Sequence, residues 1–431
     1  MRLLATFLDR FVQRGELEVT DPWGRRHRFG GRAPGHRAAI HLRDPHLAWR
    51  LVAQPSLTLG EGYMEGGLTT PPGGLYDLLA LATDNRRGAR RSWAGFLAHH
   101  RAGKLLKAVQ QHNPVGRARR RVAHHYDLSD ALFEAFLDAD RQYSCGYFES
   151  PDDDLEVAQR RKKDHLAAKL LLRDGHRVLD IGSGWGGLAL HLAGVVGVDV
   201  VGCTLSERQH EVSRARARRL GLGRRVRFDL ADYRDERGPF DRIVSVGMFE
   251  HVGAKHYPEF FARMRDLLAE DGVAVVHAIG RMGPPTVMDP WFRKYIFPGA
   301  YIPSLSEVLP AVERAGLWTT DVEILRLHYA DTLRRWRERF AARRERLDRL
   351  YDERFCRMWE YYLTASECQF RYGELMVFQL QVAKRVDAVP RTRDYIVDAR
   401  RQLEAQNRKT ASANIRTPNL NPSTGMRSSS P

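Results

Sequence analysis

The stretch Val178-Leu-Asp-Ile-Gly-Ser-Gly-Trp-Gly-Gly187 has the composition of a buried strand that runs into a glycine-rich turn. Gly182, Gly184 and Gly187 fit the spacing of a nucleotide-binding turn, in which the missing side chains let the backbone approach a ligand closely. Because this turn lies between a predicted strand and a predicted helix, we expect it to bind a cofactor that carries a ribose or an adenine.

Neighbouring residues distinguish among the nucleotide cofactors. A P-loop requires Gly-Lys-Ser/Thr, which is absent. A nicotinamide site usually has a carboxylate at the tip of the second strand, but the first acid there, Glu207, falls in the next predicted helix. S-adenosylmethionine fits better, because Asp180 can position the backbone, a water or the cofactor's amino group and Asp232 follows the third strand, where an adenine edge would be read. The alternative is a tight turn that binds no ligand.

A doubly wound α/β domain is expected to position these residues. Strand-like runs alternate with helical ones, which predicts a parallel sheet with helices on both faces. A long insert separates the fifth strand from the sixth. The predicted strands are Arg177–Ile181, Val195–Cys203, Arg225–Asp229, Phe240–Val246, Val273–Ile279 and Val322–Leu327.

The chain has 431 residues, too many for one ordinary core, so we expect more than one domain. We assign a small α+β domain to residues 1–106 and a basic linker to 107–120. The larger domain is assigned to 121–401, and a polar tail predicted to be disordered to 402–431.

The charge balance indicates an anionic partner surface, or it reflects a proteome that is generally rich in arginine. The sequence holds 69 Lys+Arg against 53 Asp+Glu, a formal net charge of +16. Residues 86–121 contain eleven Lys/Arg and no acid, with aromatic side chains between them. Such a segment lies on an anionic bilayer, or it is a solvated linker. No nucleic-acid-binding motif accompanies it, and no nucleic-acid partner is expected.

The four cysteines form no zinc-binding pattern, so no metal and a reducing compartment are expected. The apolar run in residues 1–10 is too short for a signal peptide and Asp9 interrupts it, so we expect none, and no run approaches the roughly 20 apolar residues that span a bilayer. We therefore expect a cytoplasmic protein that associates peripherally with the inner face of the membrane.

Several distinctive segments follow one another along the larger domain: His125-Tyr-Asp-Leu-Ser129, Gln142-Tyr-Ser-Cys-Gly-Tyr-Phe148, Leu179-Asp-Ile-Gly-Ser-Gly-Trp-Gly-Gly187, Thr204-Leu-Ser-Glu-Arg-Gln209, Met248-Phe-Glu-His-Val-Gly253, Val276-His-Ala-Ile-Gly280 and Tyr295-Ile-Phe-Pro-Gly-Ala-Tyr-Ile-Pro303. Together they closely resemble the cyclopropane-fatty-acyl-phospholipid synthases and the related mycolic acid cyclopropane synthases. The smaller first domain resembles the accessory domain of bacterial members.

The resemblance implies an S-adenosylmethionine-dependent methyltransferase (Rossmann-like) fold with seven strands and a helical acyl-pocket insert, preceded by a small α+β domain. It also implies a reaction. A methylene group passes from S-adenosylmethionine to the cis double bond of an unsaturated phospholipid acyl chain, and a bound bicarbonate deprotonates the carbocation so that a cyclopropane closes. Aromatic residues of the insert would line an acyl tunnel and stabilise a cation, or they are core: Trp291, Phe292, Tyr295, Phe297 and Tyr301.

Site residues are carried over by motif match. The residues implied around bicarbonate are Cys145, Glu250, His277, Ile279 and Tyr329. Those implied for the cofactor are Tyr143, Ser144, Asp180, Gly182, Gly184, Gly187, Thr204, Ser206, Gln209 and Asp232. A covalent role for the cysteine is not expected, because methyl transfer from a sulfonium to an alkene needs no covalent enzyme intermediate.

The chain departs from the family pattern at one position. Many relatives have a cysteine where this chain has Ser366. Cys368 lies two residues on, and on a helix its side chain would point elsewhere. We expect the missing cysteine to be dispensable.

Two other functions remain open. A related methyltransferase would make branched or methylene fatty acids or methylate a small molecule. The intact bicarbonate set favours cyclopropanation, because amine methylation needs no base of that kind. A non-catalytic lipid-binding protein is disfavoured by the complete glycine turn. The expected partners are unsaturated phospholipids at the membrane surface, and a homodimer is left open.

Overall fold

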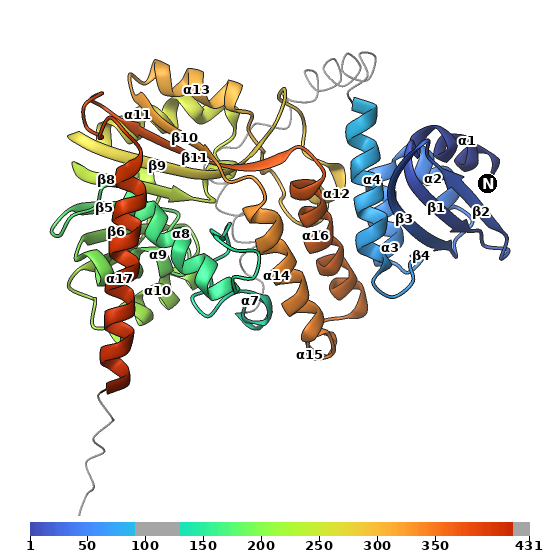
Figure 1. Cartoon of the computed structure of the whole chain (residues 1–431), viewed down its shortest axis with the longest axis horizontal. Coiled ribbons are helices and arrows are strands. Elements are labelled where there is room, and N and C mark those ends of the chain that lie inside the picture. Colours follow the sequence, from blue (N-terminus) through green and yellow to red (C-terminus); the bar gives the residue numbers. More distant parts are fainter. Residues whose placement is uncertain (91–129, 417–431) are drawn as a thin grey trace, which may run out of the picture.

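The computed structural model describes residues 1–90 and 130–416 (Figure 1). The predicted boundary at 106, the linker 107–120 and the motif at 125–129 lie outside the described residues. Within the described part, a small N-terminal domain packs on one end of a larger α/β domain (Figure 1). No helix of that part is long and apolar enough to cross a bilayer.

The small domain is a four-stranded sheet with helices packed on it. β1 pairs antiparallel with β2 and parallel with β3, and β3 pairs antiparallel with β4. Leucines, valines and an isoleucine from the sheet and the helices form its core. Its elements are α1 (Arg2–Phe11), β1 (Arg14–Thr20), β2 (Arg26–Gly30), β3 (Ala33–Leu42), α2 (Leu47–Ala53), α3 (Pro55–Met64), β4 (Leu68–Thr69) and α4 (Gly74–Arg90).

The larger domain contains the seven-stranded sheet expected from the alternating pattern, in the order β10-β11-β9-β8-β5-β6-β7. Neighbouring strands from β7 to β9 are parallel, and β11 runs antiparallel to both of its neighbours. The strands are β5 (Arg177–Ile181), β6 (Asp199–Thr204), β7 (Val226–Leu230), β8 (Phe240–Val246), β9 (Leu268–Arg281), β10 (Trp318–Ile324) and β11 (Leu375–Ala383).

Helices cover both faces of this sheet, so its central strands are buried on both sides and are rich in valine and isoleucine (Figure 1). One face packs against α8 (Leu155–Lys169), α9 (Gly187–Val196), α10 (Glu207–Arg219) and, beyond them, α17 (Asp394–Arg416). The other packs against α11 (Tyr257–Leu267) and α13 (Leu305–Arg314). Three short 3-10 turns lie beside the sheet at Tyr233–Asp235, Phe249–His251 and Ala254–His256.

A third layer joins the two domains. An aromatic core connects α3 and α4 of the small domain to the helices after β9 and β10 of the larger one. These helices are α12 (Pro290–Tyr295), α14 (His328–Ala342), α15 (Arg344–Leu350) and α16 (Glu353–Arg371). The helix α7 (Asp130–Phe136), which precedes β5, packs into the same core. The small domain therefore forms part of the wall around the centre of the molecule.

Two predicted boundaries differ from the structure. The run beginning at Val195 was assigned to a strand, but Val195 and Val196 end α9, and Gly197, with a φ of +83°, closes that helix before β6 begins. The tail was expected to be disordered from residue 402, but α17 continues to Arg416. This extension is anchored by Leu403, which packs on the core below α9, and by an ion pair of 3.5 Å between Arg161 and Glu404.

Candidate active site

Two adjoining cavities lie at the carboxyl ends of the parallel strands, where open α/β sheets bind ligands. One lies over the turns after β5, β6, β7 and β8. The other extends from this edge towards α16 and the small domain. They share Tyr143, Ser144, Gly247 and His251 as lining residues, so a group held in the first cavity can meet a group held in the second.

Most of the residues expected to bind the cofactor line the first cavity. These are Tyr143, Ser144, Asp180, Gly182, Gly184, Thr204, Gln209 and Asp232. Gly182 has a φ of +83°, and a Cβ there would approach the Cβ of Met248 to 2.8 Å, so the turn requires glycine.

Gly187 and Ser206 lie outside the lining. A Cβ on Gly187 would stand 2.5 Å from Asp140 Oδ2, and Ser206 caps α10 by accepting from the backbone of Gln209. Both residues therefore shape the cavity by local packing.

Asp180 meets the requirement for binding an ammonium group. Its side chain is buried, and Oδ2 has no hydrogen-bond partner among the described residues. Burial raises the pKa of this carboxyl to about 7, and the nearby Lys162 opposes that rise. A buried acceptor left unpaired is costly, so the amino group of a bound methionine moiety would stabilise it.

The polar residues at the ends of β6 and β7 are held in place. Thr204 Oγ1 donates to Gln209 Oε1 at 2.9 Å. Asp232 accepts from Arg234 Nε and Nη2 at 2.9 and 2.7 Å, and although burial opposes it, these bonds lower the pKa of Asp232. The aspartate is therefore ionised and fixed at the place expected for an adenine edge.

Residues 142–144 lie where the two cavities meet, and side chains of α8 hold them in place. Lys162 Nζ donates to Gln142 Oε1 at 2.5 Å and to Ser144 Oγ at 2.9 Å. Gln159, one turn earlier, donates to the Ser144 carbonyl at 2.8 Å. Lys162 is fully buried, and burial together with Lys163 lowers its pKa to about 8. Sequence reasoning missed this lysine, because charged and apolar residues alternate irregularly on the buried side of α8 and no periodicity marks that side.

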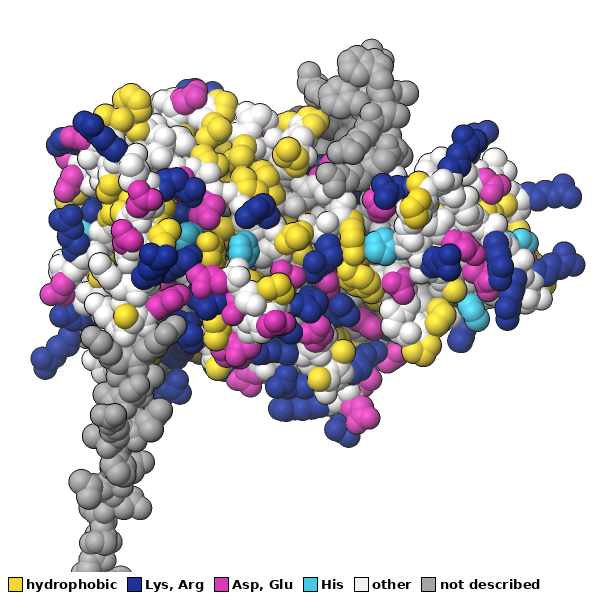
Figure 2. Space-filling view, viewed as in Figure 1, with side chains coloured by type: hydrophobic (Ala, Val, Ile, Leu, Met, Phe, Trp, Pro, Cys, Tyr) yellow, Lys and Arg dark blue, Asp and Glu magenta, His cyan; other side chains and the backbone are white. Residues whose placement is uncertain are grey.

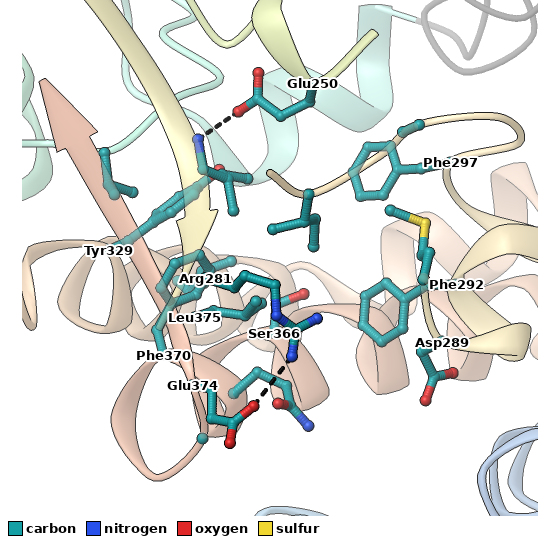
Figure 3. A pocket seen from close by; sticks show the side chains of 18 of the residues that line it. Glu250, Arg281, Asp289, Phe292, Phe297, Tyr329, Ser366, Phe370, Glu374 and Leu375 are labelled. Atoms are coloured by element: carbon teal, nitrogen blue, oxygen red, sulfur yellow. Dashed lines mark hydrogen bonds and ion pairs between the residues drawn. The ribbon is translucent and has the colours of Figure 1, made fainter. Parts of the chain in front are cut away.

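The five residues expected around bicarbonate all line the second cavity. Glu250 Oε1 accepts from the backbone N–H of Ile279 at 2.6 Å. Its Oε2 is buried with no hydrogen-bond partner among the described residues, and burial raises the pKa of this carboxyl to about 7. The backbone N–H of Ile279 thus holds Glu250, which leaves one carboxylate oxygen for a donor in the cavity (Figure 3).

The remaining members of this set are buried and neutral. Burial and nearby cations hold the pKa of His277 well below its usual range. Gln379 Nε2 lies 3.1 Å from His277 Nδ1, and this assignment leaves the ring proton on Nε2. Burial raises the pKa of the Cys145 thiol, so it carries no thiolate and is unsuited to nucleophilic attack. Tyr329 reaches the cavity from α14 (Figure 3).

The insert lines the cavity with fewer rings than expected. Phe292 and Phe297 face it (Figure 3), together with Tyr362 and Phe370 of α16. Trp291, Tyr295 and Tyr301 do not line it.

The side chains of these three residues make hydrogen bonds outside the cavity. Trp291 is buried on α3 and donates to Met64 Sδ at 3.2 Å. Tyr295 donates to Glu61 at 3.0 Å, and Tyr301 donates to Glu307 at 2.8 Å. Trp291 and Tyr295 therefore bind to α3 of the small domain, and no pattern in the sequence around them predicts these contacts.

Ser366 and Cys368 face different ways on α16. Ser366 lines the second cavity (Figure 3). Cys368 is buried against α4, with its sulfur 3.9 Å from the carbonyl oxygen of Tyr76. The helical geometry expected from the two-residue spacing is confirmed.

The comparisons with known proteins agree with this geometry. A protein family described as mycolic acid cyclopropane synthetase matches residues 114–380. The chain belongs to this family. The cyclopropane-fatty-acyl-phospholipid synthase of Escherichia coli (strain K12) is 37% identical over 362 residues, which cover 83% of this chain and 90% of that protein. A match of this length must extend into the small domain.

Two further proteins are similar over a shorter region. The tuberculostearic acid methyltransferase UfaA1 of Mycobacterium tuberculosis (strain H37Rv) is 43% identical over 61% of this chain, and the match spans 64% of that relative's length. The crystal structure of mycolic acid cyclopropane synthase CmaA1 complexed with SAH and CTAB has a TM-score of 0.59 at 35% identity, and the match covers 61% of this chain and 97% of that chain. The chain is therefore an S-adenosylmethionine-dependent methyltransferase, and the predicted fold and co-substrate are confirmed.

The first testable consequence concerns Asp180. Its carboxyl ionises near pH 7, and only the carboxylate attracts an ammonium group, so the affinity for S-adenosylmethionine should rise as the pH increases through about 7. Asp180→Asn should weaken binding by roughly 10- to 100-fold and remove this pH dependence. Isothermal titration calorimetry between about pH 5.5 and 8.5 measures both effects. A flat profile for the unaltered protein would contradict this role.

The second concerns Lys162. Lys162→Met keeps the length of the side chain but removes the donors to Gln142 and Ser144, so we expect cofactor affinity to fall by roughly tenfold. Arg160→Met alters an exposed position on the same helix and serves as the control. Equal cofactor affinity in the two variants would show that the buried lysine does not fix this segment.

The third concerns Cys368. Because its thiol packs against α4 and not into the cavity, Cys368→Ser should lower stability by about 1 kcal/mol and leave turnover largely unchanged. Ser366→Phe, which would fill part of the cavity, should reduce turnover strongly. Thermal unfolding and methyl-transfer assays measure the two effects. Complete loss of activity in Cys368→Ser would contradict the prediction.

Proposed function

We propose that this protein transfers a methylene group from S-adenosylmethionine to the cis double bond of an unsaturated phospholipid acyl chain and closes a cyclopropane ring. One observation carries the proposal. A largely apolar cavity meets the cofactor cavity at Tyr143, Ser144, Gly247 and His251, and the buried polar groups beside this junction match those expected around a small anion. An acyl chain in the second cavity would bring its double bond to the methyl donor.

The chain's own residues would align the alkene and exclude water. An alkene is a weak nucleophile, so its position against the methyl group and the absence of competing water matter most. Phe292, Phe297 and Tyr362 supply ring faces that favour a cation formed on the acyl chain. Burial at the junction also raises the pKa of Glu250 to about 7 and keeps His277 neutral at physiological pH, which lowers the cost of their desolvation.

A bound bicarbonate would supply the base that takes the proton when the ring closes. Its hydroxyl would donate to Glu250 Oε2, the buried acceptor that lacks a partner among the described residues. His277 Nε2–H and the Tyr329 hydroxyl can donate to its oxygens, and Cys145 completes this part of the wall. The backbone of Ile279 would act through Glu250, to which its N–H already donates.

Approach from the membrane surface is part of the proposal. Arginine side chains project from the small domain on the face seen in Figure 2. Trp23, which is 68% exposed, lies at the tip of the β1–β2 hairpin beside the exposed Arg25 and Arg26. An exposed tryptophan beside two arginines suits the interface of an anionic bilayer.

A second function has its own support. The match to the tuberculostearic acid methyltransferase has the higher identity, 43% against 37% for the synthase from E. coli. That match favours a branched or methylene product on the same kind of acyl chain. The match to the synthase is longer and includes part of the small domain, and for this reason we favour cyclopropanation.

The deciding experiment combines purified protein, S-adenosylmethionine and vesicles of unsaturated phospholipid. Proton NMR of the recovered acyl chains should show loss of olefinic signals and new high-field ring protons. A methyl branch or an added methylene group in place of ring protons would establish the second function. Unchanged lipid, with cofactor binding intact, would contradict both.

The catalytic part of the proposal is tested at Glu250. Glu250→Gln should lower kcat by roughly 100-fold without changing cofactor affinity, because it removes an acceptor from the acyl side of the junction. The rate of the unaltered enzyme should rise as pH increases through about 7, where this carboxyl ionises, and the variant should lose that rise. Glu313→Gln, at an exposed position, is the control. Normal turnover of Glu250→Gln would refute the role.

A further inference from the structure

Charged side chains gather in the acyl cavity on the side away from Glu250 (Figure 3). Arg281 ends β9, and its Nη2 lies 3.0 Å from Glu374 Oε2. Arg86, from α4 of the small domain, places Nη1 3.3 Å from Asp289 Oδ2. All four residues line the same cavity as the rings described above, so the cavity has a second polar end besides the junction with Glu250 and His277.

The strand fixes the distance between this end and the reaction centre. His277, Ile279 and Arg281 alternate along β9 and all line the cavity, so they share one face of the strand. Four residues of strand separate His277 from Arg281, a distance of about 13 Å. An acyl chain that reaches the junction at its middle would therefore have its ester end near Arg281.

Arg281 is the least satisfied of these charges. Its side chain is only 9% exposed, and its Nε has no hydrogen-bond partner among the described residues. Burial lowers the pKa of this guanidinium, and Glu374 opposes that effect. A buried guanidinium with an unused N–H in its planar fork is costly unless a ligand pairs with it. The fork matches two oxygens of a phosphate group.

The neighbouring charges favour an anion at the same place. Arg86 lowers the pKa of Arg281, so the two cations repel each other across the cavity. The carboxylates have other partners. Asp289 caps α12 at the backbone N–H of Trp291 and accepts from Ser56, and Glu374 orients Arg281. An anion between the two arginines would relieve their repulsion.

We propose that Arg281, assisted by Arg86, binds the phosphodiester of the lipid at this end of the cavity. The assignment rests on the proposed function and deepens it. The phosphate contact fixes which part of the acyl chain lies against the methyl donor, and it selects phospholipids over neutral glycerides. Because Arg86 belongs to α4, the small domain contributes directly to substrate selection.

The test measures binding without turnover, so it does not depend on the product formed. Dihexanoylphosphatidylethanolamine and dihexanoylglycerol, which differ by the phosphate-containing headgroup, are titrated into full-length protein saturated with S-adenosylhomocysteine. The unaltered protein should bind the phospholipid roughly 10- to 100-fold more tightly, as expected for charge-assisted hydrogen bonds. Arg281→Gln should abolish this preference while leaving the affinity for dihexanoylglycerol unchanged. Arg86→Gln should reduce the preference less, because Arg86 is more exposed.

Controls separate the proposal from a loss of folding. Arg293→Gln changes an exposed arginine on α12 and should keep the full preference. Each variant must retain the affinity for S-adenosylhomocysteine, and Arg281→Lys, which keeps the charge without the fork, should recover part of the preference. The proposal would be overturned if Arg281→Gln lowered the affinity for both ligands equally, or if the unaltered protein showed no preference for the phospholipid. Displacement of the phospholipid by glycerol 3-phosphate alone would overturn the lipid assignment in favour of a free phosphate.

Discussion

The geometry of the junction depends on one buried ammonium group. Lys162 donates to the side chains of Gln142 and Ser144, and Gln159 donates to the Ser144 carbonyl. The segment held in this way carries Tyr143 and Ser144, which line both cavities. Within residues 1–90 and 130–416 no carboxylate bonds to Lys162, so its contacts are directional hydrogen bonds to neutral acceptors, and these fix the positions of Gln142 and Ser144.

Burial sets the charges around this segment. Desolvation raises the pKa values of Asp180 and Glu250 to about 7 and depresses that of His277. The same cause acts on both acids, yet each retains one unpaired oxygen in a different cavity. Asp180 can therefore meet the cationic end of the cofactor and Glu250 can serve the acyl side, while the buried Lys162 holds the segment that lines both cavities. That separation suits a reaction in which positive charge moves from a sulfonium to a hydrocarbon.

The sequence predicted what depends on local pattern. β5 and β8 were placed at their observed bounds, and the glycine spacing located the cofactor turn. Val195 and Val196 were misassigned because a buried helix and a buried strand have the same apolar composition, and only the conformation of Gly197 separates them. The positions of three other residues are set by partners far away in the sequence, and no spacing along the chain predicts such contacts. These residues are Trp291, Tyr295 and Lys162.

The small domain has a direct place in this arrangement. The family match begins at residue 114, so α4 lies outside the matched region, yet Thr83 and Arg86 of α4 line the acyl cavity. The insert after β9 is turned towards the same domain, because Trp291 packs on α3 and Asp289 binds Ser56. A catalytic domain without these contacts would lack one wall of the cavity and one of its two arginines. The small domain, which lies outside the matched family region, thus forms part of the wall of this cavity.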